Sequence, residues 1–173
     1  MEAGDGVGGE AVSRPILGID PGKDGALVLL RGREVLAATR TRDLLGSAKW
    51  QAAHPLATGW LRSAHAEHRI DLAVLELAAG RPGEGRGSAL TTGIGWGLWL
   101  GAVSALGIPV RTPASASWTA AMFKGIAGEG KERSVSLAMQ ELPDLDLTPG
   151  PRMRKPHDGL ADAACLAMWG ERQ

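Results

Sequence analysis

Four acidic side chains in this sequence are placed where they can share one pocket. Asp20 and Glu76 each directly follow a short apolar run that is typical of a buried β-strand. If the two strands are neighbours in an α/β sheet, both carboxylates lie at its carboxyl edge, where such sheets bind ligands. Asp158 and Asp162 are spaced i, i+4 in a predicted helix and therefore share a face. Strands and helix could thus present four carboxylates to a common site.

Such a cluster predicts divalent-cation chemistry. Neighbouring carboxylates with no base between them raise one another's pKa, and burying them unpaired is costly. A bound cation removes that conflict, and oxygen ligands select Mg²⁺ or Mn²⁺ over zinc or copper. Two such ions roughly 3.5–4 Å apart are the usual apparatus for in-line hydrolysis of a phosphodiester, which needs no nucleophilic side chain. Cys165, among alanines and a leucine, is more typical of a core residue.

The elements that must position these acids alternate along the chain. The first three strands form an antiparallel meander at one edge of a sheet, and later strands are separated by helices, which predicts an α/β domain with a mixed central sheet of about five strands flanked by helices. Strands are expected at 16–19, 26–30, 34–38, 72–75 and around 108–110. Helices are expected at 47–68 with an interruption near Pro55, in the glycine-rich segment after residue 85, and at 115–123, 131–142 and 157–169.

Length and composition narrow the class of protein. The 173 residues suit a single domain, predicted at 14–173, after a disordered tail at 1–13 that does not resemble a signal peptide. A single cysteine excludes a disulfide framework and favours a reducing compartment. The 19 Lys and Arg balance 19 Asp and Glu, which argues against a purely electrostatic polyanion binder. Without the four clustered acids, however, the remainder is mildly basic.

The segment Gly87–Val110 contains no charged residue and is long enough to span a bilayer. Its six glycines, its serines and threonines and its turn-like end favour another interpretation. Gly93, Gly97 and Gly101 fall at i, i+4 and i+8, on one helical stripe where another backbone can approach closely. The segment is therefore expected to be a helix packed on the sheet or on a second subunit, with no membrane involved.

Several motifs resemble the RuvC-type Holliday junction resolvases of the RNase H-like superfamily, in particular their compact phage-type members. The similarity spans roughly residues 14–170 and includes the element order. It is carried by ILGIDPG at 16–22, VLE at 74–76, the small-residue helix, GIPV at 107–110, Lys131 at a helix start and HDGLADAA at 157–164. The resemblance implies an RNase H-like fold and a homodimer, here through the glycine-striped helix. It also implies that the dimer nicks two opposing strands of a four-way DNA junction symmetrically with Mg²⁺ or Mn²⁺.

The same resemblance assigns the metal ligands. It makes Asp20 the first ligand, Glu76 the second and Asp162 the fourth. The family's i, i+3 spacing would place the third ligand at Gly159, which has no ligand atom. Asp158 is therefore the preferred third ligand, and a nitrogen of His157 is the alternative.

Basic residues near these motifs are candidates for phosphate contacts. The loop 81–86 follows Glu76 and corresponds to the family loop that probes the junction centre, although it lacks an aromatic wedge. The candidates for DNA contact are Arg81, Arg86, Lys124, Lys131, Arg133, Arg152, Arg154 and Lys155.

Three function classes remain open at this point. The resolvase is expected in the cytoplasm of a bacterial or phage-infected cell. The alternatives are another RNase H-like nuclease, acting on RNA–DNA hybrids or other branched nucleic acids, and an inactive nucleic-acid-binding relative. The tryptophans, among them Trp96, Trp99, Trp118 and Trp169, lie at helical spacing in apolar runs and are expected in the core or at a dimer interface.

Overall fold

The computed structural model describes residues 13–46, 48–49, 53–79, 83 and 85–173, so the predicted tail lies almost wholly outside the described residues. The strands are β1 (Pro15–Ile19), β2 (Ala26–Arg31), β3 (Glu34–Arg40), β4 (Leu72–Leu75) and β5 (Val110–Arg111). The helices are α1 (Thr41–Leu45), α2 (His54–His68), α3 (Arg86–Ala105), α4 (Ser115–Met122), α5 (Lys131–Glu141) and α6 (Asp158–Glu171).

The strands form one five-stranded mixed sheet in the order β3-β2-β1-β4-β5. The β3, β2 and β1 strands pair antiparallel, whereas β4 is parallel to both β1 and β5. The predicted meander and the predicted mixed sheet are both confirmed.

Several elements differ from expectation, among them α1, α2 and β5. The short helix α1 was not predicted, because its five residues are too few to show a period. The α2 helix begins at His54 rather than at residue 47, with Pro55 in its first turn, where proline is well tolerated. The β5 strand covers Val110–Arg111 rather than 108–110, since its first backbone bond to β4 runs from Ala73 N to Pro109 O at 2.8 Å.

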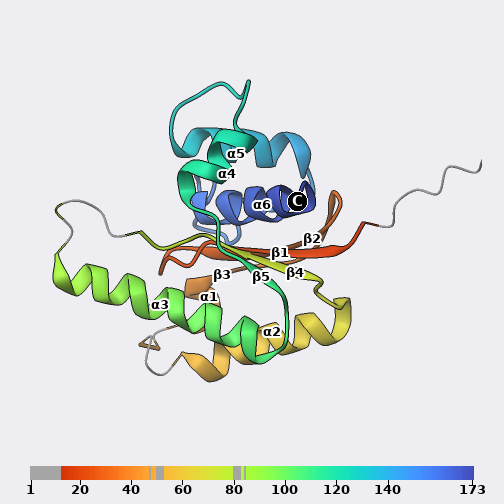
Figure 1. Cartoon of the computed structure of the whole chain (residues 1–173). Coiled ribbons are helices and arrows are strands. Elements are labelled where there is room, and N and C mark those ends of the chain that lie inside the picture. Colours follow the sequence, from red (N-terminus) through yellow and green to blue (C-terminus); the bar gives the residue numbers. More distant parts are fainter. Residues whose placement is uncertain (1–12, 47, 50–52, 80–82, 84) are drawn as a thin grey trace, which may run out of the picture.

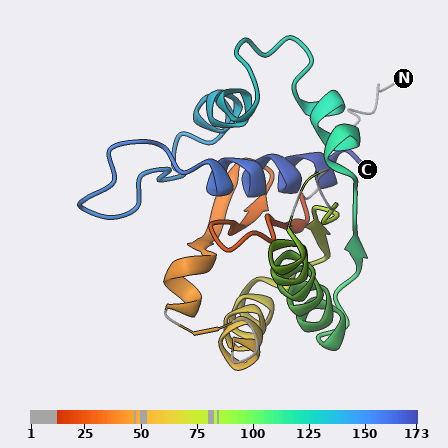
Figure 2. The same ribbon diagram turned by 90° about the vertical axis from the view of Figure 1, so that its left-hand side faces the viewer.

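Helices cover both faces of the sheet. Side chains alternate along β1, so Ile16 packs toward α6 while Leu17 and Ile19 pack toward α2 and α3. Figures 1 and 2 show α6 lying directly on the sheet, with α4 and α5 outside it and α2 and α3 on the opposite face. Because α6 is enclosed by the sheet and these outer helices, nearly every residue from Gly159 to Gly170 is buried.

The α6 helix lies very close to β1 because Gly18 has no side chain. A Cβ placed on Gly18 would be 1.9 Å from the carbonyl oxygen of Ala163 and 2.7 Å from the amide nitrogen of Ala167. Only glycine allows two backbones to approach this closely. The contact brings Asp162, the residue before Ala163, toward the end of β1 that carries Asp20.

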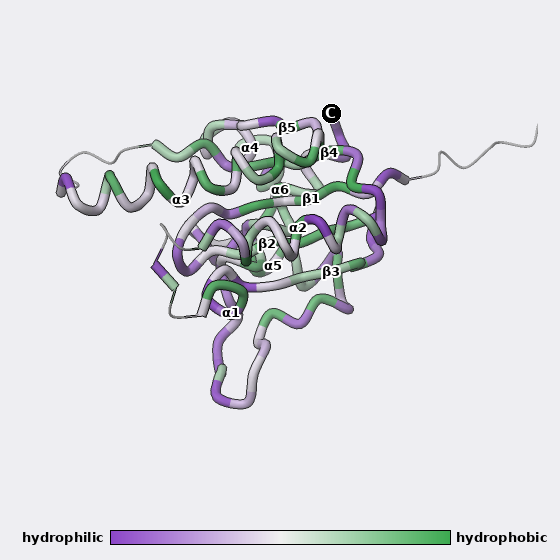
Figure 3. The backbone as a smooth tube through the Cα atoms, turned by 90° about the horizontal axis from the view of Figure 1, so that it is seen from below, coloured by the Kyte–Doolittle hydropathy of each residue, from purple (hydrophilic) through white to green (hydrophobic). Residues whose placement is uncertain are grey.

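The α3 helix extends beyond the sheet at its N-terminal end (Figure 3). Its C-terminal half packs on the sheet through residues such as Trp99, Ala102 and Val103, whereas residues 86–93 are exposed. A Cβ on Gly97 would meet no atom of the described residues within 4 Å, and Gly93 and Gly101 behave in the same way. The glycine stripe therefore faces away from the sheet. Of the two expected contacts of this stripe, with the sheet or with a second subunit, the contact with the sheet is excluded. No helix in the described part of the chain combines the length and apolar character of a membrane span.

Candidate active site

The register of β1 and β4 places Asp20 beside Glu76. Ile19 pairs with Leu75, so the two acids occupy equivalent positions just past the ends of parallel neighbours. The ladder continues one step further, because the Glu76 amide donates to the Ile19 carbonyl at 3.2 Å. The two strands are thus neighbours, which is the condition under which both carboxylates lie at one edge of the sheet.

Three of the four predicted acids line one cavity of about 310 Å³. Asp20 and Glu76 come from the sheet edge and Asp162 from α6. Lys131 and Arg133, from the start of α5, line the same cavity. The remaining lining residues are Ser115, Trp118, Thr119, Phe123 and Gly130. Segments distant in the sequence thus meet in a pocket that combines carboxylates with cations.

The environment of Asp20 and Asp162 favours the protonated form of these two acids when no cation is bound. Burial raises the pKa of Asp20 to about 7, and the charges of Asp162 and Glu76 add to the rise despite a hydrogen bond from the Gly22 amide at 3.2 Å. Burial also raises the pKa of Asp162, against the opposing effect of a hydrogen bond from Ser134. Acids that destabilise one another's charge are a common feature of functional sites.

The donor chemistry of the cavity fits a hard divalent cation. Its acids are oxygen ligands that repel one another, and a bound cation would relieve that repulsion. Among the described residues, no three His, Cys, Asp or Glu side chains are gathered closely enough to hold a metal ion as they stand. Metal binding would therefore require the carboxylates of the cavity to move closer together.

Asp158 and His157 lie at the start of α6 and do not line the cavity. Asp158 forms an ion pair with Lys131, which lowers the pKa of the acid although burial would raise it. His157 is the N-cap of α6, and its Nδ1 accepts a hydrogen bond from the Leu160 amide at 3.2 Å. Asp158 is thus linked to the cavity through Lys131, while one nitrogen of His157 is already engaged.

Lys131 is surrounded by acids. Burial alone would lower its pKa, but the neighbouring carboxylates, led by Asp158 and followed by Asp162 and Asp20, produce a net rise. The side chain is therefore a persistent ammonium at the edge of the carboxylate cluster. A negatively charged ligand in the cavity would meet this cation directly.

Two indole groups hold Glu76 in place, a role that the sequence analysis missed. Trp118 Nε1 donates to the Glu76 carboxylate Oε1 at 3.2 Å, and Trp96 Nε1 donates to the Glu76 carbonyl at 3.1 Å. Trp118 is 2% exposed, so its predicted place in the core is correct. Its ring packs edge-on against Phe123, which in turn lies under the guanidinium of Arg133. Helical spacing predicts burial of a tryptophan but not the direction of its N–H.

The basic residues predicted to contact DNA are spread over several elements. Lys131 and Arg133 are in the cavity, and Arg86 is the exposed first residue of α3. Lys124 lies in the loop after α4, and an exposed cluster in the loop before α6 contains Arg152, Arg154 and Lys155. Arg81 lies outside the described residues.

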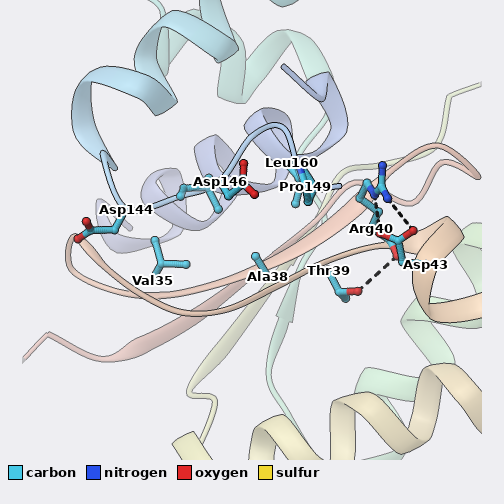
Figure 4. A pocket seen from close by; sticks show the side chains of 10 residues that line it. Val35, Ala38, Thr39, Arg40, Asp43, Asp144, Asp146, Pro149 and Leu160 are labelled. Carbon is cyan, nitrogen blue, oxygen red and sulfur yellow. Dashed lines mark hydrogen bonds and ion pairs between the residues drawn. The ribbon is translucent and has the colours of Figure 1, made fainter. Parts of the chain in front are cut away.

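A second acidic cavity, of about 240 Å³, lies between β3 and the loop before α6 (Figure 4). Its carboxylates are differently arranged. Arg40 neutralises Asp43, with Nη2 2.7 Å from Oδ1, and Asp146 accepts hydrogen bonds from the amide and hydroxyl of Thr148. Asp43 and Asp146 thus have partners within their own segments, unlike the acids that line the first cavity together.

Comparison with known proteins defines the fold. No family model matches the sequence, and no curated protein matches it. Among solved structures, Thermus thermophilus RuvC in complex with a Holliday junction substrate superposes with a TM-score of 0.62 at 18% identity, covering 90% of this chain and 91% of that one. A second structure of Thermus thermophilus RuvC gives 0.62 at 20% identity, covering 90% and 92%.

The yeast mitochondrial Holliday junction resolvase Ydc2 superposes with a TM-score of 0.66 at 13% identity, covering 93% of this chain and 79% of that one. These matches extend over nearly the whole chain and include the mixed sheet and its flanking helices. The chain therefore has the RNase H-like fold in the form found in RuvC and Ydc2. The fold predicted from the sequence motifs is confirmed.

Proposed function

We propose that this protein is a metal-dependent endonuclease that resolves four-way DNA junctions by paired symmetric nicks. The observation that carries the proposal is the meeting of Asp20, Glu76 and Asp162 in one cavity at the carboxyl edge of a RuvC-like sheet. The solved relatives of this fold include a resolvase and a RuvC bound to a Holliday junction, which supports branched DNA as the substrate.

The metal ligands in this proposal are Asp20, Glu76 and Asp162, with Asp158 as the preferred third ligand in the order given above. Capping of α6 by Nδ1 of His157 favours Asp158 over that histidine. Mg²⁺ or Mn²⁺, two ions in the full site, would activate the attacking water and stabilise charge on the phosphate in the transition state. The protein's own part is to hold Glu76 through Trp118 and to keep the Lys131 ammonium beside the carboxylates.

Lys131 is placed to compensate the charge of a bound phosphodiester. Its ion pair with Asp158 lies at the mouth of the carboxylate cluster, so a phosphate entering the cavity would compete for the same ammonium. When Asp158 turns toward a cation, Lys131 becomes available to the substrate. The exposed cations Arg86, Lys124, Arg152, Arg154 and Lys155, together with Arg133 in the cavity and Arg81 outside the described residues, would contact phosphates further along the arms.

A homodimer accounts for symmetric cutting, and α3 is its proposed interface. A Cβ added at Gly93, Gly97 or Gly101 would meet no described atom within 4 Å, and the helix carries no charged residue after Arg86. An open glycine stripe on an uncharged face permits close approach of a second helix. Two such protomers would present two cavities to the two opposing strands of one junction.

The decisive experiment compares four substrates, namely a labelled four-way junction, a Y-fork, a linear duplex and an RNA–DNA hybrid, each with Mg²⁺, Mn²⁺ or EDTA. Paired nicks in the junction, lost in EDTA and in Asp20→Asn or Glu76→Gln, are the expected result. Asp144→Asn, an exposed acid of the second cavity, is the matched control and should cut normally. Preferential cutting of the hybrid would replace the resolvase with a hybrid nuclease, and undiminished cutting by the variants would refute the carboxylate site.

A further inference from the structure

The inward face of α3 changes character where the helix leaves the sheet. Gly95, Trp99 and Ala102 lie on this face and are buried against the core. One to two turns earlier the same face carries the hydroxyls of Ser88, Thr91 and Thr92. A helix that needed only to pack would continue its apolar stripe, so the hydroxyl-bearing turns call for a polar neighbour.

These turns form one wall of a cleft of about 390 Å³. The opposite wall is the turn between β1 and β2, formed by Pro21, Gly22 and Lys23. This turn is joined directly to the candidate active site, because the Gly22 amide donates to Oδ1 of Asp20 at 3.2 Å. The cleft is therefore a second hollow that adjoins Asp20 and does not share the lining of the carboxylate cavity.

The chemistry of the cleft suits an anion. Of the described residues that line it, Lys23 alone carries a formal charge, and the lining contains no acid. Lys23 is exposed and makes no ion pair with any described residue. Thr91 donates its hydroxyl to the Gly87 carbonyl at 2.9 Å, whereas the hydroxyl of Thr92 makes no hydrogen bond within the described part of the chain. Lys23 and Thr92 are thus the donors free to take a ligand.

We propose that this cleft binds a backbone phosphate of the cut strand within about three nucleotides of the scissile bond. The inference rests on the proposed nuclease function, because it treats Asp20 as the place of cutting. Lys23 is three residues beyond Asp20, a length of chain that spans at most about 10 Å. A nucleic-acid strand carries one phosphate per about 3.4 Å of rise, so a strand held at Asp20 has a further phosphate within that reach.

The arrangement explains why α3 extends past the sheet. Its overhanging turns place Thr92 opposite Lys23, so the strand leaving the cavity is held between the overhang and the turn. The contacts are to phosphate oxygens and read no base, which makes the cleft a positioning site for the strand. Lys23 was not among the residues that the sequence analysis selected, because an isolated turn lysine looks like ordinary surface.

The test measures binding of a labelled four-way junction in EDTA, by fluorescence anisotropy over a range of salt concentrations. One lost phosphate contact lowers the slope of log K against log salt by about 0.9, which corresponds to about a fivefold weaker affinity at 0.15 M salt. Lys23→Ala should show this smaller slope and this weaker affinity for each protomer that binds the junction. Thr92→Val should weaken binding with an unchanged slope. Arg14→Ala, an exposed cation before the opposite end of β1, should leave affinity and slope unchanged.

A second arm locates the phosphate. Single neutral methylphosphonates are placed at each of the three phosphates on either side of the cut, and binding is measured with wild type and Lys23→Ala. At one position, the loss of affinity caused by the methylphosphonate and the loss caused by Lys23→Ala should be less than additive, as is found for groups in direct contact. Additive losses at every position, or a wild-type slope for Lys23→Ala, would overturn the proposal. Binding is measured here without cleavage, so the two proposals can fail separately. If wild type cuts the junction but the salt dependence of binding by Lys23→Ala equals that of wild type, only the phosphate-binding role of the cleft is refuted. If wild type does not bind the junction, the proposed function itself is refuted.

Discussion

Replacement of Gly18 by alanine tests how the fold brings Asp162 to the active site. The added Cβ would lie 1.9 Å from the Ala163 carbonyl oxygen, 2.7 Å from the Ala167 amide nitrogen and 2.9 Å from the Ala163 carbonyl carbon. Ordinary contacts of this kind begin near 3.4 Å, and all three atoms are backbone, so no side chain can rotate away. The α6 helix must move off β1, and with it the carboxylate that it carries.

The size of the effect follows from what α6 covers. The helix packs on β1, β2 and β4 and supplies much of one core cluster, so its displacement loosens that whole layer. Overpacking of a core typically costs about 1–3 kcal/mol, and the backbone clash places Gly18→Ala at about 3 kcal/mol. For a chain of this length each kcal/mol lowers Tm by about 2–4 °C, so the expected loss is about 6–12 °C. Cleavage should fall as well, since Asp162 moves.

The matched control makes the same substitution on α3. A Cβ on Gly97 meets no described atom within 4 Å, and alanine is favoured over glycine in a helix interior by about 0.5–1 kcal/mol. Gly97→Ala should therefore raise the Tm of the dilute protein slightly, while weakening any dimer that uses the stripe. Thermal and urea unfolding at several protein concentrations, with light scattering for mass, measure both effects. If the Tm of Gly18→Ala lies within about 2 °C of the wild-type Tm, the destabilisation is below about 1 kcal/mol and the reasoning is refuted.

Two further predictions concern individual side chains of the site. Trp118→Phe removes the N–H donor to Glu76 and should weaken Mn²⁺ binding severalfold, as measured by calorimetry. Trp169→Phe, which changes a core tryptophan of α6, should leave Mn²⁺ affinity unchanged. Equal Mn²⁺ affinities in the two variants would contradict the role of Trp118. The pKa of Asp20 is raised from an ordinary value of 3.8 to about 7 by folding, so its contribution to stability is complete below pH 3.8 and is lost as pH rises through 7. In EDTA, the free energy of unfolding of Asp20→Asn minus that of wild type, measured with urea, should therefore be larger at about pH 8 than at about pH 5. An equal difference at the two pH values would contradict the raised pKa of Asp20.

Local patterns were sufficient to predict much of the sheet. Ile16–Ile19 and Leu72–Leu75 are short apolar runs ended by an acid, and such runs are typical of buried strands whose last residue reaches the sheet edge. The i, i+4 spacing of Asp158 and Asp162 on a helix is likewise a local property. The strand order and the adjacency of Asp20 and Glu76 rest on pairing between distant segments.

Features that depend on side-chain direction escaped the sequence analysis. The pattern placed Trp118 in the core, but only the packing of α4 against α6 aims its N–H at Glu76. The pattern grouped Asp158 with the metal ligands, which stays a prediction, but it did not indicate that the meeting of α5 and α6 also pairs Asp158 with Lys131. In both cases the partner comes from another element, and one-dimensional spacing carries no information about it.

The sequence by itself determined the types of most elements and the acids at the strand ends, because these depend on local periodicity and residue chemistry. Tertiary structure decided which of those acids share a cavity, that the glycines of α3 face outward, and that Lys23 stands opposite Thr92 across a cleft. These outcomes depend on the register of β1 with β4 and on the distance between α6 and β1. Both are set by long-range packing, which no local stretch of sequence encodes.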